Sequence, residues 1–176
     1  MIDHMASVHI RLASDLTDSE LRGLAAVLID CVAGGDSVGF MLPLSHERAL
    51  SFWERVREHL RANRRAVLLA ESEAGEVVGT VQLIFASADN QPHRADLAKM
   101  LVRRDARRSG VGAALLTAAE RQAKACGRTV LVLDTASDAA RRLYERCGWQ
   151  RVGDVPGYAL WPEGGMCATT FYYRVL

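Results

Sequence analysis

The chain has 176 residues, a length typical of one domain that buries a substantial core. Hydrophobic residues make up 49% of it, and 22 Lys and Arg against 21 Asp and Glu give a net charge of +1. This balance disfavours a general nucleic-acid binder, and no run of ~20 apolar residues is present to span a membrane. Four cysteines without C-x-x-C or metal-type spacing predict no metal site and favour a reducing compartment, so we expect a cytoplasmic protein.

Residues 1–7 lack the pattern of a secretory signal, and we interpret them as a flexible leader or a remnant of an expression tag. From residue 8 onward, periodicity and turn signals predict a single domain (8–176) with about seven strands and about four helices. The predicted order is a strand (8–12), a helix after the capping box at Thr17 and Glu20, a helix after Ser45, three strands (66–71, 77–86, 97–102), a helix from Gly110 to Gly127, a strand buried on both faces (128–133), a helix (137–147) and two strands (150–160, 169–175). The fold class is therefore α/β, with a mixed central sheet.

The turn that follows the strand at 97–102 predicts an anion site. It holds four arginines and two glycines: Arg103, Arg104, Arg107, Arg108, Gly110 and Gly112. Glycines let a backbone approach a ligand, the first N–H groups of a helix lack partners, and guanidinium groups match phosphate oxygens. A P-loop would need Lys and Ser or Thr where Ala113 and Ala114 stand, and a dinucleotide fingerprint would need Gly in place of Leu115. We predict a pyrophosphate site of another kind; the competing interpretation is a basic loop before a helix that only packs.

The pattern Arg107-x-x-Gly110-x-Gly112, after an apolar strand that ends at Val102, resembles the coenzyme A pyrophosphate loop of the GNAT N-acetyltransferase superfamily. The predicted order of elements is similar to that superfamily's fold, and residues 140–149 resemble its helix after the fifth strand. Residues 34–41, 133–135 and 152–158 resemble the branch of tabtoxin resistance acetyltransferases, which detoxify a β-lactam amino acid. The resemblance implies a GNAT domain that transfers an acetyl group from acetyl-CoA to a primary amine.

The resemblance also implies where acetyl-CoA, the expected cosubstrate, would bind. Its pantetheine arm would pair with the backbone at 100–102, and the N–H groups of 108–113, with the Arg107 and Arg108 side chains, would hold the pyrophosphate. The superfamily often has Asn seven residues before its tyrosine, and Ser137 stands there in this chain. The expected cofactor-binding residues are Met100, Leu101, Val102, Arg107, Arg108, Ser109, Gly110, Val111, Gly112, Ala113, Ser137 and Tyr144.

Three residues are candidates for the chemistry. The resemblance places Tyr144 where many members keep an acid for the departing thiol, and a phenol of pKa about 10 can donate to a thiolate of pKa about 8.5. Asp134 and Asp96 lie on neighbouring predicted strands, where a carboxylate would attract the acceptor's ammonium and pass its proton to water. The alternatives are a core aromatic for Tyr144, a helix cap or turn residue for Asp134 and a solvated side chain for Asp96. We predict direct transfer without an acyl-cysteine, because no cysteine has a histidine base nearby in the pattern.

Large apolar side chains not used above predict the pocket for the acceptor: Phe40, Met41, Trp53, Tyr158, Trp161 and Tyr173. Aromatic walls with one or two acids suit a small zwitterionic or cationic amine, and the resemblance points to an amino acid that acts as a toxin or antibiotic. The alternatives are an acetyltransferase for another amine (an amino acid, amino sugar or polyamine), a non-catalytic acyl-CoA sensor and a nucleic-acid-binding module. We expect no nucleic-acid or membrane partner, and the sequence is compatible with a homodimer.

Overall fold

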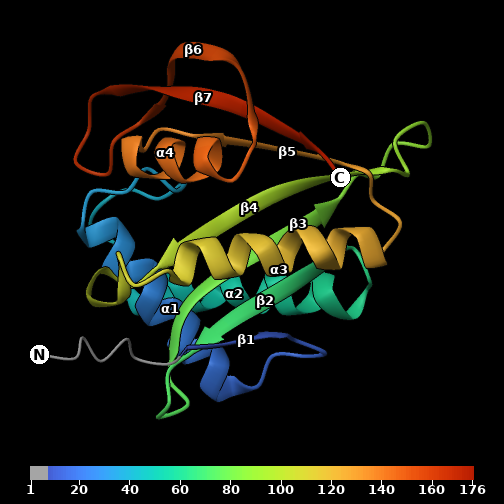
Figure 1. Cartoon of the computed structure of the whole chain (residues 1–176). Coiled ribbons are helices and arrows are strands. Elements are labelled where there is room, and N and C mark those ends of the chain that lie inside the picture. The colour runs from blue at the N-terminus through green and yellow to red at the C-terminus, as the bar shows by residue number, and fades with distance from the viewer. Residues whose placement is uncertain (1–7) are drawn as a thin grey trace, which may run out of the picture.

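The computed structural model describes residues 8–176, so the expectation for residues 1–7 lies outside the described part of the chain. In this part, one seven-stranded sheet runs in the order β1-β2-β3-β4-β5-β7-β6, with β4 and β5 parallel and the other neighbours antiparallel (Figure 1). The strands are β1 (His9–Leu12), β2 (Arg65–Glu71), β3 (Val77–Phe85), β4 (Arg94–Val102), β5 (Val130–Thr135), β6 (Gln150–Leu160) and β7 (Met166–Val175). The predicted element order and the mixed α/β sheet are confirmed.

Within residues 8–176, four α-helices cover the two faces of this sheet. α1 (Asp18–Ala33) and α2 (His46–Arg61) pack on one face, and α3 (Val111–Ala125) and α4 (Asp138–Arg146) on the other (Figure 1). Each pair buries its own hydrophobic cluster against the sheet. The predicted capping box of Thr17 and Glu20 starts α1, and Ser45 starts α2 by accepting the N–H of Arg48. None of these helices is both long and apolar enough to cross a membrane.

β4 departs from regular pairing at two places. Toward β3, Lys99 and Met100 together face the single residue Val81, which makes a β-bulge, and Lys99 takes a left-handed φ of 49°. Toward β5, pairing stops after Asp96. The two strands therefore separate beyond this point, and the rest of β4 has an open backbone edge on the side of β5.

The expectation that the strand at 128–133 is buried on both faces is wrong. In β5, Leu131 and Leu133 are buried under α3, whereas Val130 and Val132 on the opposite face are half-buried. The reason is the placement of α1 and α2, which pack on β2, β3 and β4. The continuous apolar sequence reflects the central position of β5 between β4 and β7, while one of its faces stays partly open.

Candidate active site

The turn before α3 presents a row of backbone donors. α3 begins at Val111, and its N-cap, Gly110, has a left-handed φ of 87° and no side chain to cap the helix. Within residues 8–176, the N–H groups of residues 108 to 113 have no hydrogen-bond acceptor, and the helical ladder starts when the N–H of Ala114 donates to the Gly110 carbonyl. Consecutive free donors at the positive end of a helix dipole bind anions. The predicted anion site would use these free backbone donors.

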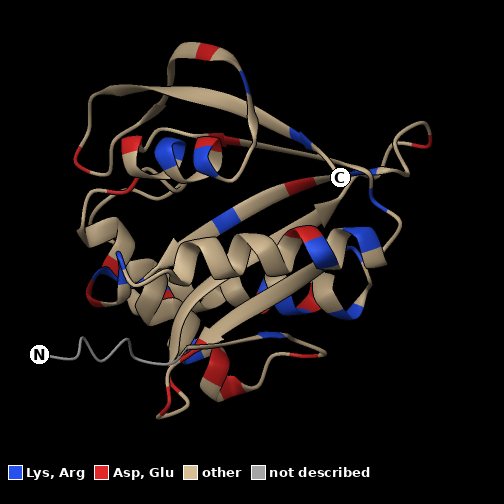
Figure 2. Ribbon diagram, viewed as in Figure 1, with Lys and Arg blue, Asp and Glu red and all other residues tan. Residues whose placement is uncertain are grey.

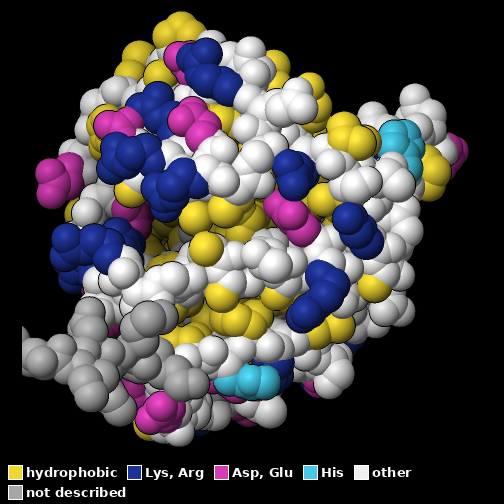
Figure 3. Space-filling model, viewed as in Figure 1, with side chains coloured by type: hydrophobic (Ala, Val, Ile, Leu, Met, Phe, Trp, Pro, Cys, Tyr) yellow, Lys and Arg dark blue, Asp and Glu magenta, His cyan; other side chains and the backbone are white. Residues whose placement is uncertain are grey.

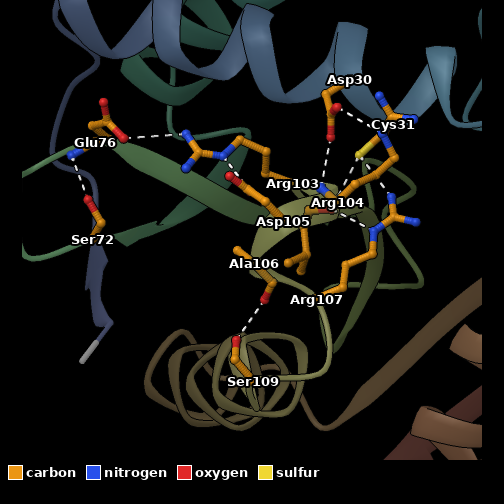
Figure 4. Close-up of polar contacts among 11 residues, drawn as sticks. Asp30, Cys31, Ser72, Glu76, Arg103, Arg104, Asp105, Ala106, Arg107 and Ser109 are labelled. Atoms are coloured by element: carbon orange, nitrogen blue, oxygen red, sulfur yellow. Dashed lines mark hydrogen bonds and ion pairs between the residues drawn. The ribbon is translucent and has the colours of Figure 1, made fainter. Parts of the chain in front are cut away.

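The arginine side chains of this turn are largely engaged elsewhere (Figure 4). Three of the four form ion pairs: Arg103 with Asp105 (2.7 Å), Arg104 with Asp30 (2.9 Å) and Arg107 with Asp36 (2.5 Å). Arg107 also donates from Nε to the Val102 carbonyl oxygen (2.9 Å) and from Nη2 to Cys31 Sγ (3.5 Å). The Arg107 guanidinium therefore joins the end of β4 to the loop after α1, and its contact with phosphate stays a prediction. Arg108 is exposed and pairs with no other described residue, so its side chain can reach an anion.

The expected pantetheine-binding residues lie on the part of β4 whose edge toward β5 is open. Met100 and Val102 are half-buried against the α3 core, and Leu101 is buried. On the surface above them, hydrophobic side chains gather in a hollowed band between α3 and α4 (Figure 3). An open strand edge beside an apolar hollow suits a chain of amides and methylenes.

Tyr144 lies on α4, with its ring in the core between that helix and the sheet. The ring centroids of Trp149 and Tyr172 are 5.7 Å and 6.0 Å away, and Tyr144 is 4% exposed. Its hydroxyl has no hydrogen-bond partner among residues 8–176. Burial raises the pKa of Tyr144, and the negative charge of Asp134 raises it further. The phenol therefore stays protonated, which is the form that can donate a proton.

The start of α3 lies beside α4. Ser137 is the N-cap of α4, and its Oγ accepts the N–H of Ala140 (3.3 Å). The alternative that Asp134 caps this helix is therefore wrong. A methyl group on Gly112, near the start of α3, would lie 3.2 Å from Leu143 Cδ2 in the second half of α4, so glycine allows α3 and α4 to approach closely. The hydroxyl of Ser137 still has a hydrogen to donate toward a ligand between the helices.

The two candidate carboxylates differ in their partners. Asp134, near the end of β5, is exposed and accepts a hydrogen bond from the Thr169 hydroxyl (2.7 Å). Asp96, the last residue of β4 that pairs with β5, forms an ion pair with Arg94 (2.5 Å). A carboxylate with a cationic partner has less attraction left for an ammonium. Asp134 is thus the more available of the two.

The loop between α1 and α2, residues 34–45, carries two of the predicted acceptor residues, Phe40 and Met41. Three hydrogen bonds attach it to the β6–β7 end. Ser37 Oγ donates to the Leu160 carbonyl (3.1 Å) and accepts from Cys167 Sγ (3.5 Å), and the Leu42 N–H donates to the Pro162 carbonyl (2.9 Å). Trp161 lies between these two acceptors and lines a hollow of about 430 Å³ with residues 33–35 and 162–164. The structure thus brings the loop and Trp161 together.

The other predicted acceptor residues lie elsewhere. Trp53 is 0% exposed in the core of α1 and α2, which contradicts its assignment to a pocket. Its position on the apolar face of α2 explains the burial. Tyr158 is exposed on β6 with its ring packed edge-on against Phe171 (5.7 Å), and the Tyr173 hydroxyl donates to Gln150 across the β6–β7 pair.

Two side chains beside the loop were not among the predicted site residues. Lys99 Nζ lies 5.6 Å from the ring centroid of Phe52, and that ring lies 5.3 Å from the ring of Phe40. Burial lowers the pKa of Lys99, while the charge of Asp134 acts in the opposite direction. A single lysine inside the apolar run 97–102 was the sequence signal, but the bulge that directs it cannot be read from the sequence.

Charged groups of both signs are interspersed on the helices and turns (Figure 2). In residues 8–176, no group of three or more His, Cys, Asp or Glu is placed to hold a metal ion. The candidate site therefore offers backbone donors, an apolar hollow, a buried phenol, a carboxylate and a lysine. These groups can bind a diphosphate and exchange protons with an amine and a thiol.

The sequence model of the acetyltransferase (GNAT) family matches residues 38–149. The chain belongs to this family. A protein of Azospirillum brasilense, described as an uncharacterized N-acetyltransferase in the hisH–hisA intergenic region, is 29% identical to this GNAT protein over 145 residues, 81% of this chain and 83% of that one. The solved ribosomal-protein-alanine N-acetyltransferase from Brucella melitensis is 25% identical (TM-score 0.77; 96% and 99% of the two chains covered). A GNAT superfamily phosphinothricin acetyltransferase from Sinorhizobium meliloti, solved with acetyl-CoA, is 19% identical (TM-score 0.79; 96% and 88% covered).

This GNAT protein is an acetyl-CoA-dependent N-acetyltransferase, and its residues fit that cosubstrate. The free N–H groups of residues 108 to 113 match a pyrophosphate, which needs several donors at once. Gly110 supplies the left-handed turn that aims them, and no atom lies within 4 Å of the place where its side chain would begin.

Proposed function

We propose that this N-acetyltransferase acetylates the primary amine of a small molecule. The α1–α2 loop carries the proposal, because it is fixed on both sides of the separation between β4 and β5. On one side Asp36 pairs with Arg107 of the pyrophosphate turn, and on the other Ser37 and Leu42 bond to the β6–β7 end. A loop fastened in this way leaves more room for a small amine than for a polypeptide.

Cosubstrate binding falls to the turn and to β4. Acetyl-CoA, when bound, supplies an acetyl thioester. The N–H groups of residues 108 to 113 hold the diphosphate, and the side chain of Arg108 adds a positive charge. The open backbone edge around Met100 and Leu101 pairs with the amides of the pantetheine arm, and Ser137 donates to it from the start of α4.

The proton transfers fall to Asp134 and Tyr144. Asp134 attracts the acceptor's ammonium and passes one proton to water, which leaves a neutral amine. The amine nitrogen then bonds to the acetyl carbon while the carbon–sulfur bond breaks, and Tyr144 donates its hydroxyl proton to the leaving sulfur. One of the two protons left on the nitrogen passes to solvent and the other stays as the amide N–H, while Tyr144 regains a proton from water, so each turnover releases one proton. Asp96 is the second candidate for the base, but its ion pair with Arg94 makes it less available to the amine.

The acceptor we propose is an amino acid that acts as a toxin or antibiotic. Its support is the sequence resemblance to the tabtoxin resistance branch at residues 34–41 and 152–158. The first of these segments is in the α1–α2 loop, and the second is in β6 beside the turn to which that loop is bonded. Both segments are therefore at the place that we propose for the acceptor.

Thiol release with a panel of amines tests the proposal. The panel holds tabtoxinine-β-lactam, phosphinothricin, the standard amino acids, amino sugars and polyamines, each with acetyl-CoA. We expect release with at least one small amine and none with ribosomal-protein peptides. Acetylation of the peptides alone would contradict a small-molecule acceptor. Binding of acetyl-CoA without release for any amine would instead identify a non-catalytic sensor.

We also propose that the enzyme works in a reducing compartment such as the cytoplasm. The support is that all four cysteines are free thiols in the structure.

A further inference from the structure

Lys99 is directed to the acceptor side by the bulge in β4. A side chain in the left-handed region costs about 1 kcal/mol or more, so the conformation at φ of 49° is held by the surrounding structure. Met100, the other bulge residue, packs toward α3, whereas Lys99 lies on the opposite face, under the α1–α2 loop. A methyl group on Gly39 of that loop would be 3.7 Å from Lys99 Nζ, and the ring of Phe52 from α2 flanks the ammonium.

The ammonium of Lys99 has no counterion in contact. Among residues 8–176, Nζ makes no hydrogen bond and no ion pair, although the side chain is half-buried and an ammonium carries three donors. The charged groups that act on it are the carboxylate of Asp134, from β5, and the guanidinium of Arg65, from β2. Lys99 Nζ and the carboxylate oxygens of Asp134 form no ion pair, so they are more than 4.0 Å apart. The ammonium of Lys99 on β4 and the carboxylate of Asp134 on β5 therefore do not neutralise each other by direct contact.

Arg65 adds positive charge behind Lys99. Its guanidinium donates to Gln82 Oε1 (2.6 Å) and lies 2.6 Å from His59 Nδ1, and no carboxylate of residues 8–176 pairs with it. Gln82 is fully buried, sits opposite Ala98 in the sheet, and leaves its Nε2 without a partner. Arg65 thus adds to the positive charge around Lys99, while Asp134 on β5 is anionic.

We propose that Lys99 binds the carboxylate of the acceptor while Asp134 binds its ammonium, so that the enzyme selects amino acids over amines without an acid group. The inference rests on the proposed function and names its substrate class. A zwitterion carries its two charges a few ångströms apart and neutralises both strands at once. Three unused donors on a partly desolvated ammonium favour a carboxylate strongly, and an analogue without it leaves that ammonium unpaired.

The test compares acceptors that differ only in this group. Each amino acid of the panel that releases thiol, standard or toxin, is measured against its carboxamide. The value of kcat/KM is determined for wild type, Lys99→Met, Lys99→Arg and the exposed-surface control Lys124→Met. We expect wild type and Lys124→Met to prefer the acid by about 10- to 100-fold, Lys99→Met to lower that ratio to about one, and Lys99→Arg to keep most of it. Thermal melting and CoA calorimetry check that each variant is folded and binds the cosubstrate.

Each other outcome has a definite meaning. Equal use of acid and carboxamide by wild type overturns the inference and leaves the proposed small-amine acetylation standing. If Lys99→Met lowers kcat/KM equally for the acid and the carboxamide, the inference is also overturned, because that result is expected of a general base or a structural residue. Thiol release with no amine of any kind overturns the proposed function and this inference together.

Discussion

Removing the hydroxyl of Tyr144 is the sharpest test of the proposed chemistry. In Tyr144→Phe the ring keeps its contacts with Trp149 and Tyr172, and no hydrogen bond is lost among the described residues. The free energy of unfolding should therefore change by less than about 0.5 kcal/mol. A general acid typically raises the reaction rate 10²- to 10⁴-fold. The thiolate of CoA, whose thiol has a pKa near 8.5, is a better leaving group than an alkoxide and gains less from protonation. We expect kcat to fall by about 100-fold, which corresponds to about 2.7 kcal/mol.

The assay follows thiol release at saturating acetyl-CoA, with calorimetry for cosubstrate affinity. Tyr172→Phe is the matched control, because it removes the bond from the Tyr172 hydroxyl to Glu145 Oε1 (2.7 Å), away from the proposed chemistry. Its kcat should stay near that of wild type. Since burial raises the pKa of Tyr144, loss of the phenol proton should not lower the wild-type kcat below about pH 10. An unchanged kcat in Tyr144→Phe would refute the acid role.

Three further predictions follow from the geometry. Arg108→Met should weaken CoA binding by about 10-fold in calorimetry, whereas Arg107→Met should mainly raise the KM for the amine; the reverse order would contradict the assignment. Trp53→Ala should lower the free energy of unfolding in urea by about 3–5 kcal/mol, against about 0.5 or less for the exposed Trp161→Ala, and similar losses would count against a core role. Cys31, whose pKa burial raises to about 11, should escape iodoacetamide at pH 8 in the folded enzyme, and alkylation as fast as in urea would show that its thiol is accessible.

Local signals in the sequence are sufficient for the order of elements and for the free backbone donors before α3. Caps, turn residues and periodicity act over a few residues, so Thr17 with Glu20, or Gly110 before α3, can be recognised without the rest of the chain. The donors at 108 to 113 follow from helix geometry alone. These features are fixed by neighbours in the chain.

Other features depend on residues far apart in the sequence. The partner of Arg107 is 71 residues away, and nothing near the arginine shows that its charge is already neutralised by Asp36. The direction of Lys99 depends on how β4 pairs with β3, and a bulge leaves no reliable mark in the residues around it. Its residue type alone favours Trp53 as a pocket residue, but its burial is decided by which face of α2 packs against the rest of the core.

Isothermal calorimetry with CoA and with pantetheine, on the folded wild-type enzyme, tests most directly whether the donors at the start of α3 hold the pyrophosphate. CoA should bind with measurable heat, and pantetheine, which lacks the diphosphate, should bind at least about 100-fold more weakly. Equal affinity for the two ligands, or no heat with CoA, would contradict a cosubstrate site built on residues 108 to 113.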